Sequence, residues 1–129
     1  MQSLSAKTLL GHAFSHDAAG REAKAIPFYR RAIARGLSRA DLRDALIGLG
    51  SSLRSVGQTR AAIRTLQKAR TLFPRDPAVV LFLALAHASA GQHALALRQV
   101  ADALLRESKN PLLAPYRKVL GRKFHGLRT

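Results

Sequence analysis

Two histidines near the start of the chain have the spacing of metal ligands. His12 and His16 are four residues apart, so both imidazoles would lie on one face of a helix, and Asp17 could add a carboxylate. Two ligands on one short helix do not make a site by themselves. We therefore interpret these residues as solvated side chains, and we expect neither a metal nor another cofactor.

The remaining residue types indicate no catalytic centre. The chain has no cysteine and only 7 acidic residues, which removes thiolate chemistry and leaves few carboxylates for a hydrolase. Asp41 is expected to stabilise the start of a helix, where backbone amides are free. The segment Gly48-Leu49-Gly50 lies inside an expected helix, so its amides are already bonded and cannot cradle a phosphate. We predict that the protein is not an enzyme.

The charge of the chain is strongly positive. It has 22 Lys and Arg residues against 7 Asp and Glu residues, a formal net charge of +15. Such an excess favours contact with nucleic acid or another anionic surface, although a solvated basic surface explains the composition as well. The expected basic surface comprises Arg30, Arg31, Arg64, Lys68, Arg98, Arg117, Lys118, Arg122 and Lys123.

No segment of the sequence is apolar enough to cross a membrane. The longest unbroken apolar stretch, residues 78–86, is less than half of the roughly 20 residues that a spanning helix needs. The N-terminus contains only the short apolar run Leu9-Leu10, so it lacks the central region of a signal peptide. These features, with the absence of cysteine, predict a cytoplasmic protein without a transmembrane segment.

The chain repeats itself with a period of 34 residues. A shift of 34 positions aligns eight residues with partners of similar size and polarity. The pairs are Leu46 and Val80, Leu49 and Leu83, Gly50 and Ala84, Gly57 and Gly91, Ala62 and Ala96, Ile63 and Leu97, Leu66 and Val100, and Ala69 and Ala103. Within each unit, apolar residues recur at three and four residues on both sides of a glycine, which predicts two packed helices joined by a tight turn.

A less regular copy comes first and a separate helix comes last. The first copy keeps the order of residue types but has two extra residues between Leu10 and Gly20. After Asn110-Pro111, an apolar face from Leu113 to Phe124 predicts a final helix that caps the open end of the stack. We therefore expect one all-α domain over residues 1–129, made of three antiparallel helix pairs and a capping helix. The expected bounds are about 4–38, 42–76, 77–110 and 111–125.

The second copy resembles the consensus of the tetratricopeptide repeat (TPR) family. The residues that carry this resemblance are Leu49-Gly50, Leu53, Gly57, Ala62, Ala69 and Pro74. The third copy departs from the consensus at Ala84, His87 and Ser108, and the resemblance covers about residues 4–108. His87 replaces a large core residue, so we expect it to pack and form a hydrogen bond rather than act as a base. The strings LGHAF, GREAKAIPFYRRAI, GLGSSLRSVG and LFPRDPAV also resemble small bacterial TPR proteins of undefined role.

The resemblance implies an α-α superhelix, in which the first helix of each pair lines a concave groove that binds partners. The corresponding groove residues are Thr8, His12, Asp44, Ile47, Ser51, Arg54, Ser55, Ala78, Leu81, Leu85 and Ala88. Chaperone-binding members hold a peptide carboxylate with Lys, Asn and Arg, and only Arg54 matches them, so we do not expect that ligand. The apolar Ile47, Leu81 and Leu85 favour an apolar helix or an extended segment instead.

Three functions compete on this basis. The first is a protein-interaction scaffold that binds a partner protein or peptide in the concave groove, with homo-oligomerisation through residues 78–85 if the cap leaves that face open. The alternative is an electrostatic binder of nucleic acid, ribosome or another polyanion through the basic exterior. An enzyme comes last, because no nucleophile, base or metal cluster is visible. We predict the protein-interaction scaffold.

Overall fold

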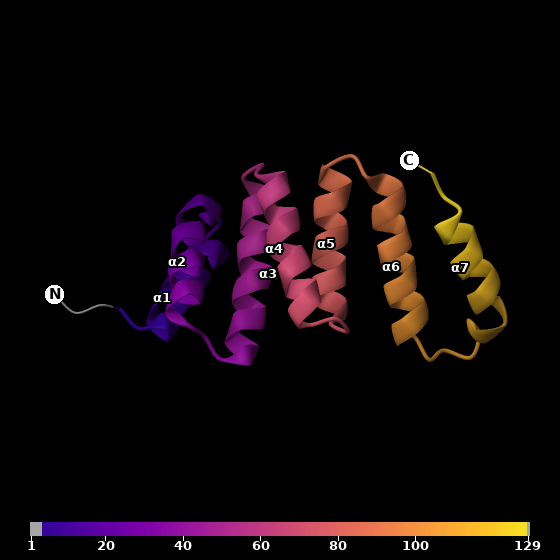
Figure 1. Cartoon of the computed structure of the whole chain (residues 1–129), viewed down its shortest axis with the longest axis horizontal. Coiled ribbons are helices and arrows are strands. Elements are labelled where there is room, and N and C mark those ends of the chain that lie inside the picture. Colours follow the sequence, from indigo (N-terminus) through magenta and orange to yellow (C-terminus); the bar gives the residue numbers. More distant parts are fainter. Residues whose placement is uncertain (1–3, 129) are drawn as a thin grey trace.

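The computed structural model describes residues 4–128, which form α-helices, one 3-10 helix and connecting loops (Figure 1). No strand occurs in this part of the chain, so the predicted all-α class is confirmed. The elements are α1 (Ala6–Ala18), α2 (Glu22–Arg35), α3 (Arg39–Ser55), α4 (Thr59–Leu72), α5 (Pro77–Ser89), α6 (His93–Glu107), η1 (Ala114–Tyr116) and α7 (Arg117–His125).

The helices pack as antiparallel pairs that follow one another along a row. The α1 helix packs on α2, α3 on α4, and α5 on α6, while α2 contacts α3 and α4 contacts α5 (Figure 1). The first helices also touch directly, because α3 contacts both α1 and α5. This arrangement is the predicted stack of helix pairs, and α1, α3 and α5 together form one face of it, which we call the first-helix face. None of the helices in residues 4–128 is long and apolar enough to span a membrane.

Glycines reverse the chain inside the second and third pairs. Gly57 and Gly91 have φ angles of 86° and 81°, a region that residues with a Cβ rarely adopt. After Gly57, the amide of Gln58 donates to the carbonyl of Leu53 at 2.9 Å, and Gln92 donates to His87 in the same way at 2.9 Å. These bonds satisfy carbonyls at the end of the first helix, so the second helix can begin at once.

The core lies inside the pairs and at the junctions between them. Its largest fully buried side chains include Tyr29, Leu9, Leu53, Leu66 and Leu83. Glycines allow the closest approaches, because a Cβ at position 50 would overlap the side chain of Leu66. Burial of this kind contributes about 1.5–3 kcal/mol for each large apolar side chain.

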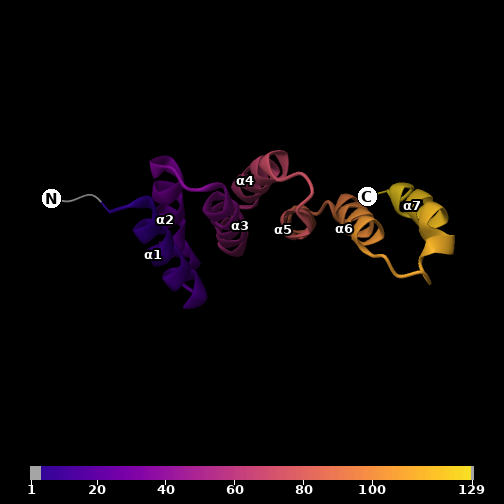
Figure 2. The same cartoon turned by 90° about the horizontal axis from the view of Figure 1, so that it is seen from below.

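The last helix covers less of the stack than the sequence suggests. It follows α6 and contacts it, but within residues 4–128 it makes no contact with α5 (Figures 1 and 2). No residue of α7 is buried. The guanidinium of Arg117 donates to the carbonyls of Leu105 and Ser108, which attaches the start of α7 to the end of α6. The predicted closure of the open end is therefore partial, because this nine-residue helix contacts α6 and η1 but not α5.

Candidate protein-binding site

A depression of about 380 Å³ lies on the first-helix face, between α1, α3 and α5. Its walls include Phe14 of α1 and Phe82 of α5. The predicted groove residues that line it are Asp44, Ile47, Ser51 and Ala78. The structure thus brings together residues from two repeats, and it adds the half-exposed ring of Phe14, which the sequence analysis did not select.

A carboxylate forms the polar end of this depression. Asp17 accepts a hydrogen bond of 2.6 Å from the hydroxyl of Tyr29 and a longer one of 3.5 Å from Ser52. Desolvation, followed by the bond to Asp17, raises the pKa of Tyr29 above its ordinary value, so this hydroxyl stays a donor. Asp17 therefore links the first and second pairs.

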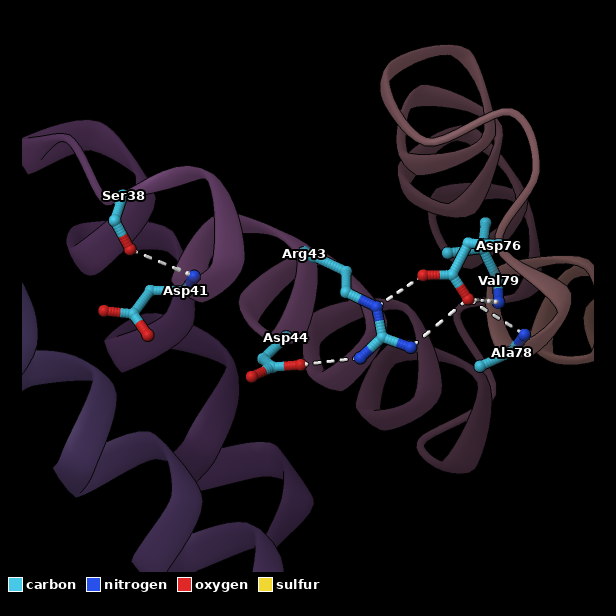
Figure 3. Close-up of polar contacts among 7 residues, drawn as sticks. All are labelled: Ser38, Asp41, Arg43, Asp44, Asp76, Ala78 and Val79. Atoms are coloured by element: carbon cyan, nitrogen blue, oxygen red, sulfur yellow. Dashed lines mark hydrogen bonds and ion pairs between the residues drawn. The ribbon is translucent and has the colours of Figure 1, made fainter.

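An arginine connects the depression to the start of α5 (Figure 3). Arg43 donates to both carboxylate oxygens of Asp76 and, at 2.9 Å, to Asp44. Asp76 in turn caps α5 by accepting from the amides of Ala78 at 3.0 Å and Val79 at 3.3 Å. The hydrogen bonds from Arg43 are the main cause that lowers the pKa of Asp76 below its ordinary value.

The consequence of this network is that the predicted groove residue Asp44 is ion-paired within the protein. The charged residues that line the depression are Asp17, Arg43 and Asp44, a formal net charge of −1, in contrast to the net charge of +15 of the whole chain. Sequence reasoning missed Arg43 and Asp76, because they are 33 residues apart and neither belongs to an apolar stripe. The nearest sequence signal is the position of Asp76 directly before Pro77, which is typical of a helix N-cap.

The same region contains a second capping interaction, at the start of α3. The hydroxyl of Ser38 accepts from the amide of Asp41 at 3.2 Å (Figure 3). Ser38 is therefore the N-cap of α3, and Asp41 lies in its first turn as predicted for a helix-start acid.

An apolar groove of about 510 Å³ runs between α5 and α6. Predicted groove residues from α5 line one side of it, namely Leu81, Leu85 and Ala88. Leu81 and Leu85 are 45% and 47% exposed, and from α6 Leu97 and Val100 are 49% and 40% exposed. In the 34-residue repeat, Leu97 and Val100 are the partners of Ile63 and Leu66 in the second pair. Their exposure could not be read from that pattern.

The remaining predicted groove residues lie outside both hollows. Thr8 and His12 are exposed on α1, and Ser55 is exposed at the end of α3. Arg54 donates to the hydroxyl of Ser89 at 2.9 Å and to the carbonyl of Leu85 at 3.3 Å, so it links α3 to α5.

The histidines of α1 stack on an aromatic ring. The rings of His12 and His16 lie 5.3 and 5.4 Å from the ring of Phe28, centroid to centroid, and Arg21 donates to His16 at 3.0 Å. Desolvation and the charges of Arg21 and Lys24 lower the pKa of His16. Among residues 4–128, no three His, Cys, Asp or Glu side chains lie close enough to share a metal ion.

The predicted packing role of His87 is confirmed. This residue is 5% exposed, and its Nδ1 atom lies 2.9 Å from Oε1 of the buried Gln99.

The predicted basic residues divide into two groups. Some are exposed on the second helices and on α7, and these are Arg30, Arg31, Arg64, Lys68, Lys118, Arg122 and Lys123. Arg98 and Arg117 are partly buried and donate to backbone carbonyls, Arg98 to that of Leu127 at 2.8 Å. These two residues fasten the C-terminal segment to α6.

Comparison with known proteins agrees with this architecture. A family model described as "Tetratrico peptide repeat" matches residues 6–119, which is most of the chain. No curated protein matches the sequence.

Proposed function

Because this chain belongs to the tetratricopeptide repeat family, whose repeats are generally protein-interaction modules, we propose that it binds a segment of a partner protein in the concave TPR groove. The family is typically non-catalytic, and we extend this to the chain itself: it acts as a scaffold. The observation that carries the proposal is the exposure of Leu81 and Leu85, at 45% and 47%, beside the apolar groove.

The two hollows have different chemistry and so would select different parts of a partner. The α5–α6 groove is lined almost wholly by apolar side chains, and the hydrophobic effect favours burial of apolar surface there by about 25 cal/mol per Å², before the entropy lost on association is subtracted. The depression between α1, α3 and α5 offers Asp17, Arg43 and Ser51 beside Phe14. Polar groups of this kind fix the orientation of a bound segment, while the apolar groove supplies most of the affinity.

Affinity capture from a lysate tests the proposal. The double variant Leu81→Glu/Leu85→Glu places two charges in the apolar groove, and we expect it to lose the proteins that the wild type retains after nuclease treatment. Leu112→Glu is the matched control, because Leu112 is 80% exposed and lies outside both hollows. Retention of the same partners by the double variant would contradict the proposal.

A polyanion is the second candidate partner, and α4 favours it. This helix has Arg60, Arg64, Lys68 and Arg70 and no acidic residue. If several phosphates are contacted, affinity for RNA or duplex DNA falls about 10³-fold or more between about 50 and 200 mM salt. Fluorescence titration measures this change, with Arg64→Gln/Lys68→Gln as the weakened variant. Absence of binding at low salt would end this candidate.

A further inference from the structure

Equivalent positions of the second and third pairs differ sharply in burial. Leu66 on α4 is 0% exposed, and it belongs to one core cluster with Leu83 and Ala86 of the following helix, α5. Val100 occupies the same repeat position on α6 and is 40% exposed. A helix therefore covers the second pair where the third pair is open.

The uncovered region is a continuous apolar surface, which we call the open slot. Leu81 and Leu85 of α5 form one side of it, Leu97, Val100 and Leu104 of α6 form the floor, and Leu120 and Phe124 of α7 form the other side. The α5–α6 groove and a hollow of about 210 Å³ between α6 and α7 share Leu97 and Val100. Since α5 and α7 make no contact within residues 4–128, nothing in this part of the chain closes the slot.

The second helix pair shows which structural element can cover an apolar surface of this kind. On the second pair, the equivalent position is occupied by α5, a helix of 13 residues that buries Val79, Val80, Leu83 and Ala86. Two of the three floor residues repeat the pattern of α4, with Leu97 for Ile63 and Val100 for Leu66, while Leu104 stands where α4 has Arg70. A helix with a similar apolar face is therefore the shape that the slot accepts.

The charge around the open slot distinguishes between two possible occupants, a second copy of this chain and another protein. The α7 side carries Arg117, Lys118, Arg122 and Lys123 and no acidic residue. The nearby acids have partners within the chain, since Glu107 forms an ion pair with Arg106 at 3.3 Å and Asp102 shares a hydrogen bond of 2.9 Å with His125. A second copy would bring another +15 charges and be repelled, whereas acidic side chains on the occupant would be attracted.

We propose that the open slot binds an amphipathic α-helix of a partner protein whose polar flank is acidic, and that this helix takes the place of the first helix of a fourth pair. This inference rests on the proposed protein-binding function and specifies its partner. It differs from that function in requiring Leu104 of α6 and the helix α7, which line neither of the two hollows.

Two synthetic peptides with one apolar face test the inference. Both copy residues 76–90, with the exposed residues changed as Leu81→Glu, Leu85→Glu and Ser89→Glu in the acidic peptide and Leu81→Lys, Leu85→Lys and Ser89→Lys in the basic one. Fluorescence anisotropy with the full chain at about 50 mM salt should show the acidic peptide binding about 10-fold or more tighter, with the difference shrinking as salt rises. No binding of the acidic peptide, or equal binding of both, would overturn the inference.

Variants of the chain test whether the acidic peptide binds in the open slot. Val100→Asp and Leu104→Asp each place a charge on the floor of the slot and should weaken the acidic peptide about 10-fold or more, while Leu112→Asp should change it less than about twofold. Leu104 is 61% exposed, so this variant should fold even if Val100→Asp does not, and circular dichroism checks both. Unchanged binding by a folded Leu104→Asp variant would overturn the inference.

Two further outcomes separate this inference from the proposed function. Partner capture that is lost in Leu81→Glu/Leu85→Glu but kept in Leu104→Asp, whose side chain lies outside both hollows, would overturn the slot and leave the concave groove supported. Light scattering of the wild type should show a monomer. A dimer that Leu104→Asp dissociates would make a second copy the occupant and overturn the acidic partner.

Discussion

The second and third helix pairs follow the same sequence pattern but end in different environments. In the second pair, Leu66 is fully buried because α5 covers α4, whereas Val100 at the same position of the third pair is 40% exposed. The comparison shows that a repeat position defines a surface that another helix can cover, and that the neighbour decides whether the surface becomes core or binding site.

The largest effect on this contrast is expected when the side chain is truncated to alanine at each of the two positions in turn. Leu66→Ala should lower the free energy of unfolding by about 2–5 kcal/mol, because it leaves a cavity in the core. Val100→Ala should cost less than about 1 kcal/mol, since its side chain is already in contact with water. Urea unfolding followed by circular dichroism measures both, and similar losses would show that the third pair is covered.

A second test gives two contacting residues of the second helix pair the side chains found at the same positions of the third pair. Gly50 packs against Leu66, and a Cβ at position 50 would overlap that leucine, while the third pair has Ala84 and Val100 instead. Gly50→Ala should therefore destabilise the protein by about 1–3 kcal/mol. Gly50→Ala/Leu66→Val keeps the number of carbon atoms and should recover at least part of the loss. An additive effect in thermal unfolding would contradict this explanation.

The third helix pair buries two polar side chains, and the second helix pair has an apolar and a small residue at the same positions. His87 and Gln99 correspond to Leu53 and Thr65. His87→Leu should cost about 1–3 kcal/mol, because the buried Gln99 loses its partner. His87→Leu/Gln99→Leu removes both polar groups and should be more stable than the single variant. A double-mutant cycle by urea unfolding shows whether the two residues are coupled.

The smallest expected effect concerns the junction that joins the two pairs. Asp76→Ala should cost about 1 kcal/mol at neutral pH through the lost N-cap of α5. Because the pKa of Asp76 is lowered in the folded state, its stabilisation is complete above the unfolded pKa and disappears as the pH falls through the folded one. The difference between wild type and Asp76→Ala in urea unfolding should thus vanish in strong acid. A difference that persists there would exclude the carboxylate as its source.

Part of the site follows from the sequence and part does not. The resemblance to the TPR family predicts that Asp44, Ile47, Ser51 and Ala78 lie on one face, and in the structure they line one depression. That resemblance could not show that Arg54 donates to Ser89, or that Arg43 pairs with Asp76, since each of these bonds joins side chains that are far apart in the chain. Thr8 and His12 lie outside the hollows, and Phe14 and Asp17 are the α1 residues that line the depression.

The sequence by itself determined the helices, their pairing and the family. The physical reason is that apolar spacing, turn glycines and caps act within one repeat, over distances that the chain order sets. Only the tertiary structure decided which apolar faces stay uncovered, because burial depends on how α7 sits on α6 and on the missing contact between α7 and α5. Leu66 and Val100 are equivalent in the pattern, and they differ because one has a helix above it and the other does not.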